Sequence, residues 1–431
     1  MTNLLRRVVP VREGETAPVL IATAYGFCIL FSYYILRPVR DEISTADRGN
    51  LQILWTVVFL VMLVAVPLYS YTVSKYSRSV FIPLANRFFA LNLILFFLAI
   101  YLLPEGARIW IDRTFYVWTS VFALFVVTVF WGYIADLFRN DQGRRLFGFI
   151  AVGSSLGGIA GSLLTSLLAE AIPVFFLLLM SVVPLEAAAQ LAKALHGYSA
   201  RDQSTLRREG PDRVPGGAMS GIRTVFGSPY LRQIALFLAL MTFASTVLYF
   251  QQAFLVGREF TDRGVRTAFL ARIDLAVNIL TILTQGFLTA HIIRRIGIGL
   301  TLASLPVVTC LGFVALGVYP LLWTLVILQV IYRSGRYALT RPAREVLFTL
   351  VGREERYKSK AFIDAAVYRG GDLVSGWIYA GLVSIGLSIG AIALVAAPVA
   401  AIWAGLGLAL GKKEAVARAA KDEDQPATQT A

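Results

Sequence analysis

The stretch "LQILWTVVFLVMLVAVPLYSYT" (residues 51–72) carries no charged side chain over 22 residues. As a helix it is about 33 Å long, which matches the hydrocarbon core of a bilayer. Similar apolar runs recur along the 431-residue chain, and charged residues make up only 15% of it. A soluble domain carries about 25% charged residues. The sequence therefore predicts an all-α integral membrane protein, and it lacks the alternating segments that are typical of a β-barrel.

Apolar runs between charged residues and Pro/Gly breaks predict twelve transmembrane helices. They are expected at residues 17–38, 51–72, 81–103, 114–137, 147–168, 172–194, 229–256, 267–290, 297–317, 321–340, 361–384 and 386–410. A polar, basic stretch separates the sixth from the seventh. The predicted domains are an N-terminal six-helix half (1–194), a cytoplasmic linker (195–228), a C-terminal six-helix half (229–410) and a disordered cytoplasmic tail (411–431).

The net charge of +14 would be compatible with a nucleic-acid partner. Most basic residues, however, lie in short segments between apolar runs, as the positive-inside rule describes. Their distribution places both termini in the cytoplasm. The first apolar run follows Arg6, Arg7 and Arg12 and is too long for a signal-peptide core, so we expect it to be retained as a span. These features predict a multi-pass protein of the inner (cytoplasmic) membrane with no nucleic-acid partner.

Short matching segments indicate that the two halves are a pseudo-repeat. "ADLF" at 135–138 corresponds to "EVLF" at 345–348, and "FIAVGSSLGG" at 149–158 corresponds to "FIDAAVYRGG" at 362–371. An internal repeat in a chain with twelve spans is typical of secondary transporters.

Several ionisable residues fall inside the predicted spans, where each costs at least about 2.5–3.5 kcal/mol to insert. In the first span, Tyr33, Arg37, Arg40 and Asp41 share one helical face, and Pro38 interrupts the backbone hydrogen bonding. Two arginines on one face beside aromatic rings favour an anion-binding site. The alternative is that these side chains snorkel to the membrane surface near the helix end.

The predicted span at 321–340 carries two arginines deeper in the membrane. Arg333 and Arg336 lie about 20 and 24 Å beyond Pro320 along the helix, on one face with Gln329 and Thr340. Two cations three residues apart repel each other unless an anion or acidic side chains lie between them. Because a guanidinium fork matches phosphate or carboxylate oxygens, this pair favours an anion site.

The span at 361–384 supplies a polar stripe of Asp364, Tyr368, Asp372 and Ser375. Arg369 lies three residues from Asp372, so a purely structural ion pair between them is the alternative to a role in binding.

The span at 267–290 has one polar face, formed by Asp274, Asn278, Thr281 and Gln285. Asp274 could neutralise an arginine of the other half or carry a coupling proton.

Other motifs point to packing rather than chemistry. Gly153, Gly157 and Gly161 have the small-xxx-small spacing of tightly packed membrane helices. There is no phosphate-binding glycine loop. His196 and His291 are isolated, so no metal site is expected, and no catalytic triad or other enzyme signature is found. We therefore expect no catalytic residues, no metal and no cofactor.

Four motifs resemble the ATP:ADP antiporter (Tlc-type nucleotide exchange) family and its bacterial relatives. They are "YYILRPVRDE" (33–42), "FWGYIADLFRNDQGRRLFGFIAVGSSLGG" (130–158), "SPYLRQIALFLALMTFASTVLYFQQA" (228–253) and "YALTRPAREVLFTLVGREERYKSKAFIDAAVYRGGDLVSGW" (337–377). The resemblance implies a major-facilitator-like fold of twelve helices and exchange of phosphorylated nucleotides without hydrolysis. It also implies that Arg37 and Arg40 face a central cavity from one half, and Arg333 and Arg336 from the other.

The leading hypothesis is therefore a monomeric secondary transporter for a small anionic solute such as a nucleotide. The predicted substrate-binding residues are Tyr33, Tyr34, Arg37, Arg40, Arg333, Arg336, Tyr368 and Arg369. The predicted charge-balancing or coupling residues are Asp41, Asp274, Asn278, Gln285, Asp364 and Asp372. One alternative is a proton-coupled facilitator for another organic anion or an amphipathic compound. Another is a membrane scaffold or sensor without transport, which would pair every intramembrane arginine with an acid.

Overall fold

A computed structural model describes residue 12 and residues 14–138, 140–201 and 218–424. No β-strand occurs in these ranges, so the predicted all-α class is confirmed for the part of the chain that they cover. The chain forms two compact units. Unit 1 comprises Met1–Pro211 and Gly257–Asn278, and unit 2 comprises Asp212–Val256 and Ile279–Ala431.

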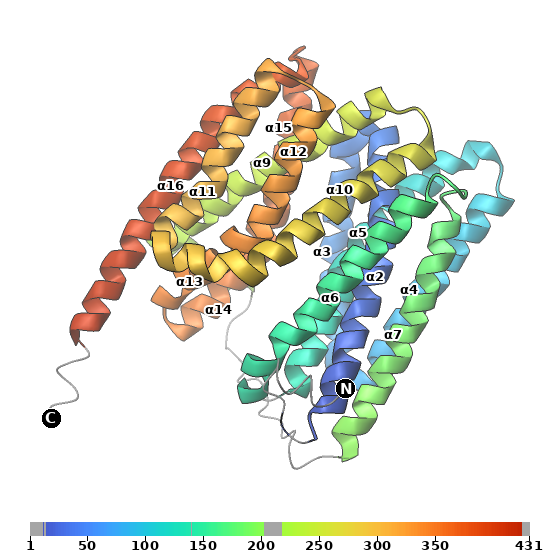
Figure 1. The fold of residues 1–431 in the computed structure, drawn as a ribbon, viewed down its shortest axis with the longest axis horizontal. Coiled ribbons are helices and arrows are strands. Elements are labelled where there is room, and N and C mark those ends of the chain that lie inside the picture. Colours follow the sequence, from blue (N-terminus) through green and yellow to red (C-terminus); the bar gives the residue numbers. More distant parts are fainter. Residues whose placement is uncertain (1–11, 13, 139, 202–217, 425–431) are drawn as a thin grey trace. The chain divides into compact units, whose positions relative to one another are not determined.

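Unit 1 is built around its first long helix (Figure 1). Its helices are α2 (Thr16–Ala46), η1 (Arg48–Asn50), α3 (Leu51–Lys75), α4 (Arg78–Leu102), η2 (Glu105–Ala107), α5 (Arg108–Leu137), α6 (Asn140–Leu168) and α7 (Phe176–Arg201). Helix α2 packs against α5, α6 and α7, and α4 packs against α5 and α7. Because α2 has neighbours on several sides, its charged C-terminal turns lie inside the unit rather than on its surface.

Small residues set the close approach of α6 to α2. A Cβ atom added at Gly157 would lie 2.2 Å from the carbonyl oxygen of Phe27, and one at Gly161 would lie 2.5 Å from that of Phe31. One at Gly153 would lie 2.2 Å from the Thr23 side chain. The prediction that these glycines serve helix packing is therefore confirmed.

Unit 2 contains most of the remaining helices. They are α8 (Ala218–Gly227), α11 (Thr289–Val318), α12 (Leu322–Gly335), α13 (Arg341–Leu347), η5 (Phe348–Leu350), α14 (Arg353–Phe362), α15 (Tyr368–Ser384) and α16 (Ile389–Asp424). Helix α11 packs against α12 and α16, and α8 packs against α14. Gly297, within α11, has φ +76°, and this bend lies at the break predicted between the spans 267–290 and 297–317.

Two helices pass from one unit into the other. Helix α9 (Pro229–Glu259) begins in unit 2 and ends in unit 1, and α10 (Arg263–Leu283) begins in unit 1 and ends in unit 2. The segment Gly257–Asn278, which we call the hairpin tip, therefore belongs to unit 1 and comprises the end of α9 and most of α10.

Three π-helical turns interrupt the helices of unit 2: η3 (Thr284–Leu288), η4 (Arg336–Thr340) and η6 (Ile363–Val367). A π turn inserts an extra residue per turn and rotates the side chains that follow it, and such turns occur frequently at functional sites. Arg336 is the first residue of η4. The apolar periodicity of the sequence does not predict these turns.

Nine helices within the described residues are long and apolar enough to cross a membrane. Eight of the predicted spans correspond to separate helices in this set, and the predicted spans 267–290 and 297–317 merge into one continuous apolar segment. Helices α12 and α15 have only 14 and 17 residues. The helical path continues beyond α12 through the π turn η4, and it reaches α15 through the π turn η6. The count of twelve spans therefore stays a prediction.

Two predicted segments differ from the structure in part. The predicted disordered tail begins at 411, but α16 continues to Asp424, because "KKEAVARAAK" is rich in strong helix formers. The predicted linker begins at 195, whereas α7 continues to Arg201 and α8 occupies Ala218–Gly227. Residues 202–217 and 425–431 lie outside the described residues.

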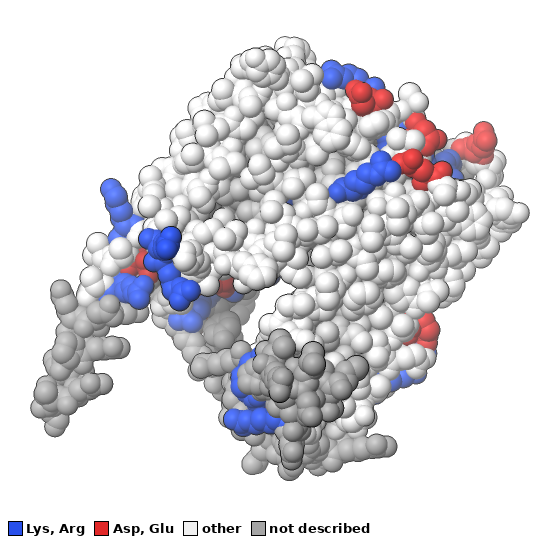
Figure 2. Space-filling view, in the orientation of Figure 1, with Lys and Arg blue, Asp and Glu red and all other residues white. Residues whose placement is uncertain are grey.

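Figure 2 shows how charge is distributed on one face of each unit. The visible lysine, arginine, aspartate and glutamate side chains gather toward the ends of the helices, and the surface between them is uncharged. This distribution is what a bilayer requires of a multi-pass protein.

Candidate functional site

The C-terminal turns of α2 hold a buried cluster of charges. Arg37 Nε lies 3.7 Å from Asp41 Oδ2 and 3.5 Å from Asp274 Oδ2 of α10, and Arg40 Nε lies 3.9 Å from Asp41 Oδ1. The side chains of Asp41 and Asp274 are 5% and 2% exposed, whereas those of Arg37 and Arg40 are 15% and 18% exposed. The acids thus lie behind the arginines, which keep some access to the outside of the unit.

Aromatic rings line the same cluster. The Arg37 guanidinium lies over the Tyr34 ring, 5.7 Å from its centroid, and Arg40 lies over Tyr116 at 4.8 Å. Arg40 also donates a hydrogen bond to the Tyr116 hydroxyl (3.3 Å), which accepts a second one from Trp55 Nε1 (2.8 Å). Tyr33 packs edge-on against Tyr34 at 5.2 Å. Cation–π contacts hold a guanidinium without neutralising it, so the arginines keep their attraction for anions.

Asn278 lies one turn along α10 from Asp274 and makes a second contact within unit 1. Its Nδ2 lies 3.4 Å from Ser162 Oγ on α6. Helix α10 therefore contacts α2 through Asp274 and α6 through Asn278.

A second group of charges lies where α2 ends. Glu42, only 1% exposed, accepts hydrogen bonds from Arg266 (2.6 Å), and its other oxygen lies 2.8 Å from Arg263 Nε. Arg263 also donates two hydrogen bonds to Asp112 of α5, at 3.0 and 3.1 Å, and Asp112 pairs with Arg108. These ion pairs hold the hairpin tip firmly against α2 and α5.

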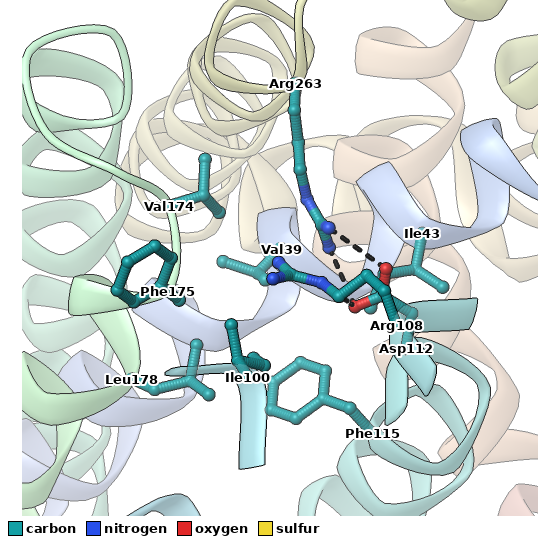
Figure 3. A pocket seen from close by; sticks show the side chains of 10 residues that line it. All are labelled: Val39, Ile43, Ile100, Arg108, Asp112, Phe115, Val174, Phe175, Leu178 and Arg263. Carbon is teal, nitrogen blue, oxygen red and sulfur yellow. Dashed lines mark hydrogen bonds and ion pairs between the residues drawn. The ribbon is translucent and has the colours of Figure 1, made fainter. Parts of the chain in front are cut away.

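Figure 3 shows a small pocket beside this group. Arg263 and Asp112 point toward each other along one side of it, with Arg108 next to them, and Phe175 and Leu178 lie on the other side. Because its cations are already paired with Asp112 and its other walls are apolar, the pocket does not resemble an anion site.

Unit 2 holds a different arginine cluster. Arg336 donates a hydrogen bond to Ser245 Oγ of α9 (3.1 Å) and lies over the Tyr368 ring of α15, 5.0 Å from its centroid. It forms no ion pair with any acid in the described part of the chain. Arg333, one turn earlier, is 7% exposed. Tyr332 donates a hydrogen bond to the Met241 carbonyl (2.6 Å), which fixes α12 against α9 beside these arginines.

Other predicted site residues of unit 2 contact partners other than the Arg336 side chain. Gln285 Nε2 donates a hydrogen bond to the Tyr337 carbonyl at 3.1 Å. Arg369 and Asp372 are 3.9 Å apart, which is the internal ion pair considered as the alternative to a binding role. Asp364 pairs with Arg344 at 2.9 Å and has an exposed side chain.

Arg344 links Asp364 to a network at the ends of α13 and α14. Glu345 accepts hydrogen bonds from Lys360 (2.5 Å) and from Arg344 (3.1 Å). Although burial raises the pKa of Glu345, these two hydrogen bonds lower it overall below its usual range. Because Asp364 belongs to this network, its position favours a structural role over contact with a substrate.

The structure adds contacts that the sequence analysis did not single out. They involve Glu42, Asp112, Tyr116, Ser245, Arg263 and Arg266. In the sequence, Arg263 and Arg266 resemble ordinary cations of a loop. Their pairing with Glu42 becomes evident only in the structure, where they lie beside α2. One signal in the sequence pointed to a buried charge network: the adjacent acids Asp41 and Glu42 stand at the end of an apolar run.

Chemically, each unit presents guanidinium groups beside tyrosine rings. Guanidinium groups donate in a planar fork that matches carboxylate and phosphate oxygens, and tyrosine rings can stack with planar ligands. In unit 1 buried carboxylates balance the arginines, and in unit 2 Arg336 has a hydroxyl and a ring instead. The arrangement can therefore bind an anionic solute that also carries a flat ring.

Comparisons with known proteins show which solved structures share this fold. No family model matches the chain. The "ADP,ATP carrier protein 1, chloroplastic" of Arabidopsis thaliana is 23% identical over 78% of this chain, which spans 64% of that relative's length. The "ADP,ATP carrier protein 1" of Chlamydia trachomatis is 22% identical over 96% of this chain and 92% of its own.

Two solved structures are similar over nearly the whole chain. The POT family transporter PepTSo has a TM-score of 0.64 and 12% identity, and it covers 93% of this chain and 98% of its own. The nucleoside transporter NupG has a TM-score of 0.62 and 13% identity, with 93% and 99% covered. The chain thus shares the helical fold of these major facilitator transporters.

Proposed function

We propose that the protein is a secondary transporter that moves a phosphorylated anionic solute by alternating access, and that its solutes are nucleotides exchanged as triphosphate against diphosphate. The fold is that of membrane transporters, and two of the relatives above are named as ADP,ATP carriers. A nucleotide has the two features that the arginine–tyrosine clusters select: phosphate oxygens and a flat ring.

The observation that carries this proposal is the environment of Arg336. Its guanidinium lies within the predicted span 321–340, at a π turn, and contacts a serine hydroxyl and a tyrosine ring. A cation without an acidic partner is costly in a membrane, so such groups usually mark a substrate or ion pathway. A scaffold without transport would instead neutralise this arginine internally, which disfavours that alternative.

The cluster of unit 1 supports the same class of substrate. Arg37 and Arg40 keep partial exposure, and their acidic partners lie deeper. We propose that Tyr33 and Tyr34 contribute ring contacts there, and that Tyr368 does so in unit 2. The twelve spans, the cytoplasmic termini, the inner-membrane location and the monomeric state remain predictions that accompany this function.

Exchange in proteoliposomes tests the proposal. Vesicles containing the purified protein and loaded with ADP are expected to take up labelled ATP, and vesicles without internal nucleotide are expected to take up little. Absence of ATP uptake in both would remove nucleotide exchange as the function. Uptake that follows an imposed pH gradient and needs no internal nucleotide would instead establish proton-coupled transport.

A further inference from the structure

We infer that Gln252 of α9 and Gln329 of α12 recognise the base of the nucleotide, binding its polar edge while Arg336 binds phosphate. The inference rests on the proposed function, because it names the residues that select the base of the proposed solute. Both glutamines belong to unit 2, as does Arg336. They lie within the predicted spans 229–256 and 321–340.

The two glutamines belong to polar stripes on α9 and α12. Each stripe has the spacing i, i+4, i+7, which places its side chains on one helical face. The stripes consist of Ser245, Tyr249 and Gln252 on α9, and of Gln329, Arg333 and Arg336 on α12 and its continuation η4.

Hydrogen bonds join the two stripes at both ends. Gln329 Nε2 donates to Gln252 Oε1 (2.9 Å), and Arg336 Nη1 donates to Ser245 Oγ (3.1 Å). The two contacts are seven residues apart on each helix, so α9 and α12 run antiparallel here and the amide pair lies about 10 Å along the helices from the guanidinium. This separation is comparable with the length of a nucleotide from the edge of its base to its phosphates.

The amide pair keeps hydrogen-bonding groups that it does not use. A glutamine side chain can donate two hydrogen bonds and accept two. Within the residues that the structure describes, the bond between Gln252 and Gln329 is the only one that either side chain makes. The amino group of Gln252 and the carbonyl oxygen of Gln329 therefore remain for a ligand. Turning both amides over reverses their bond but again leaves one amino group and one carbonyl oxygen.

Burial makes these unused groups informative. Gln252 and Gln329 are only 4% and 5% exposed. Buried polar groups in proteins are almost always paired, because an unpaired group costs free energy. A contact that served only to join α9 to α12 would explain the one hydrogen bond between the amides, but not the remaining amino group and carbonyl oxygen. A ligand that pairs with both groups explains them.

A nucleobase edge has the complementary pair of groups. Adenine carries an amino group that donates beside a ring nitrogen that accepts, and a glutamine amide matches this edge with two hydrogen bonds. In the inferred site, Gln329 accepts a hydrogen bond from the amino group and Gln252 donates one to the ring nitrogen. Inorganic phosphates and sugar phosphates have no such planar edge. The amide pair thus selects a nucleotide over other phosphorylated anions, which Arg336 alone cannot do.

Binding of three ligands that share a triphosphate chain tests the inference. They are ATP, purine riboside triphosphate, which lacks the amino group of adenine, and tripolyphosphate, which lacks the base. Gln329→Met removes the acceptor for the amino group, so it should weaken ATP binding by roughly 5- to 150-fold and leave the other two affinities unchanged. Gln252→Met removes the donor to the ring nitrogen, so it should weaken binding of both nucleotides and leave that of tripolyphosphate unchanged.

The neighbouring glutamine on α9 provides a matched control. Gln251 is 0% exposed, and its amide donates a hydrogen bond to the Ile389 carbonyl of α16 instead. Gln251→Met therefore removes an equally buried amide from the same helix. The affinity for ATP relative to that for tripolyphosphate should stay at the wild-type value in this variant.

The outcomes separate this inference from the proposed function. If wild type binds ATP and Gln329→Met keeps the wild-type preference for ATP over purine riboside triphosphate, the base site is wrong while nucleotide transport stands. If the preference changes as expected but proteoliposomes do not exchange nucleotides, the base site holds and the transport proposal fails. Absence of ATP binding to wild type overturns both. Should Gln329→Met fold poorly, Gln329→Asn replaces it: a reduced preference for ATP supports the site, and an unchanged preference contradicts it.

Discussion

Arg266 of α10 donates two hydrogen bonds to a single carboxylate oxygen of Glu42 on α2, from Nη2 at 2.6 Å and from Nε at 3.1 Å. The two residues are 224 positions apart in the chain, and Glu42 is 1% exposed. Because Arg263 contacts the other oxygen of the same carboxylate, one buried acid fastens two cations of the hairpin tip.

Removing this acid should destabilise the protein strongly. Glu42→Gln preserves the shape of the side chain and leaves Arg266 buried with less compensation, so we expect the free energy of unfolding to fall by about 3 kcal/mol. Equilibrium denaturation in detergent micelles measures the change. Glu170→Gln breaks an ion pair of nearly the same length, 2.7 Å, whose side chains are 56% and 43% exposed. The Glu170→Gln substitution should lower the free energy of unfolding by less than about 1 kcal/mol. Equal losses for the two variants would show that burial of the Glu42 network has little energetic effect.

The contact of α6 with α2 predicts a contrast between two glycines of the same helix. Gly157→Ala places a methyl group 2.2 Å from the Phe27 carbonyl oxygen, so the helices must separate. We expect a loss of about 1–3 kcal/mol in the free energy of unfolding, as for other overpacked sites. Gly148→Ala meets nothing within 4 Å and should be neutral or stabilising by up to about 1 kcal/mol. Similar unfolding curves for the two alanine variants would contradict the close approach.

The helices themselves were largely predictable, because apolar runs of membrane-spanning length and small-xxx-small spacing are local features. Gly157 is an example: its spacing predicted close helix packing, although it did not predict that α2 is the partner. The three π turns were not predictable, since they change the helical register without changing the apolar composition. The end of α16 was also misplaced, because a charged stretch rich in alanine resembles a disordered tail and yet forms helix readily.

The site was predictable as a set of residue types but not as a set of contacts. Arg37, Arg336 and Asp274 stood out because ionisable residues inside apolar runs are costly. Which acid approaches which arginine depends on the packing of helices that are distant in sequence. Asp364 illustrates the limit: it shares a helical stripe with Tyr368 in sequence, but the structure pairs it with Arg344 instead.

The Glu345 network predicts how stability depends on pH. The pKa of Glu345 in the folded protein lies below its ordinary value of 4.5, so its ion pairs stabilise the fold above that value. This stabilisation is lost as the pH falls through the lowered folded pKa. We expect Glu345→Gln to lower the unfolding temperature at pH 6–7, and the difference from wild type to shrink as the pH falls below about 4.5.

A partner substitution checks that the pH effect comes from this network. Lys360→Met removes the donor at 2.5 Å, so it should reduce both the stability at pH 6–7 and its dependence on pH. Thermal unfolding of the three proteins between pH 3.5 and 7 provides the comparison. A wild-type advantage that stays constant down to pH 3.5 would mean that the Glu345 carboxylate does not contribute through its charge.

The environment of Arg336 predicts a dependence on both the charge and the shape of this side chain. If the guanidinium holds phosphate oxygens of the solute, Arg336→Gln should weaken binding of the transported anion by roughly tenfold to a hundredfold, the value of a charge-assisted hydrogen bond. Arg336→Lys keeps the positive charge but loses the planar fork and the stacking on Tyr368, so it should recover only part of the affinity. Arg294→Ala removes an exposed arginine that donates a hydrogen bond to the Ala290 carbonyl of its own helix, and transport should be unchanged. Uptake rates in proteoliposomes, measured over a range of solute concentrations, distinguish these variants. Full activity of Arg336→Gln would mean that the solute does not contact this arginine, and the anion site would then have to be sought at Arg37 and Arg40 alone.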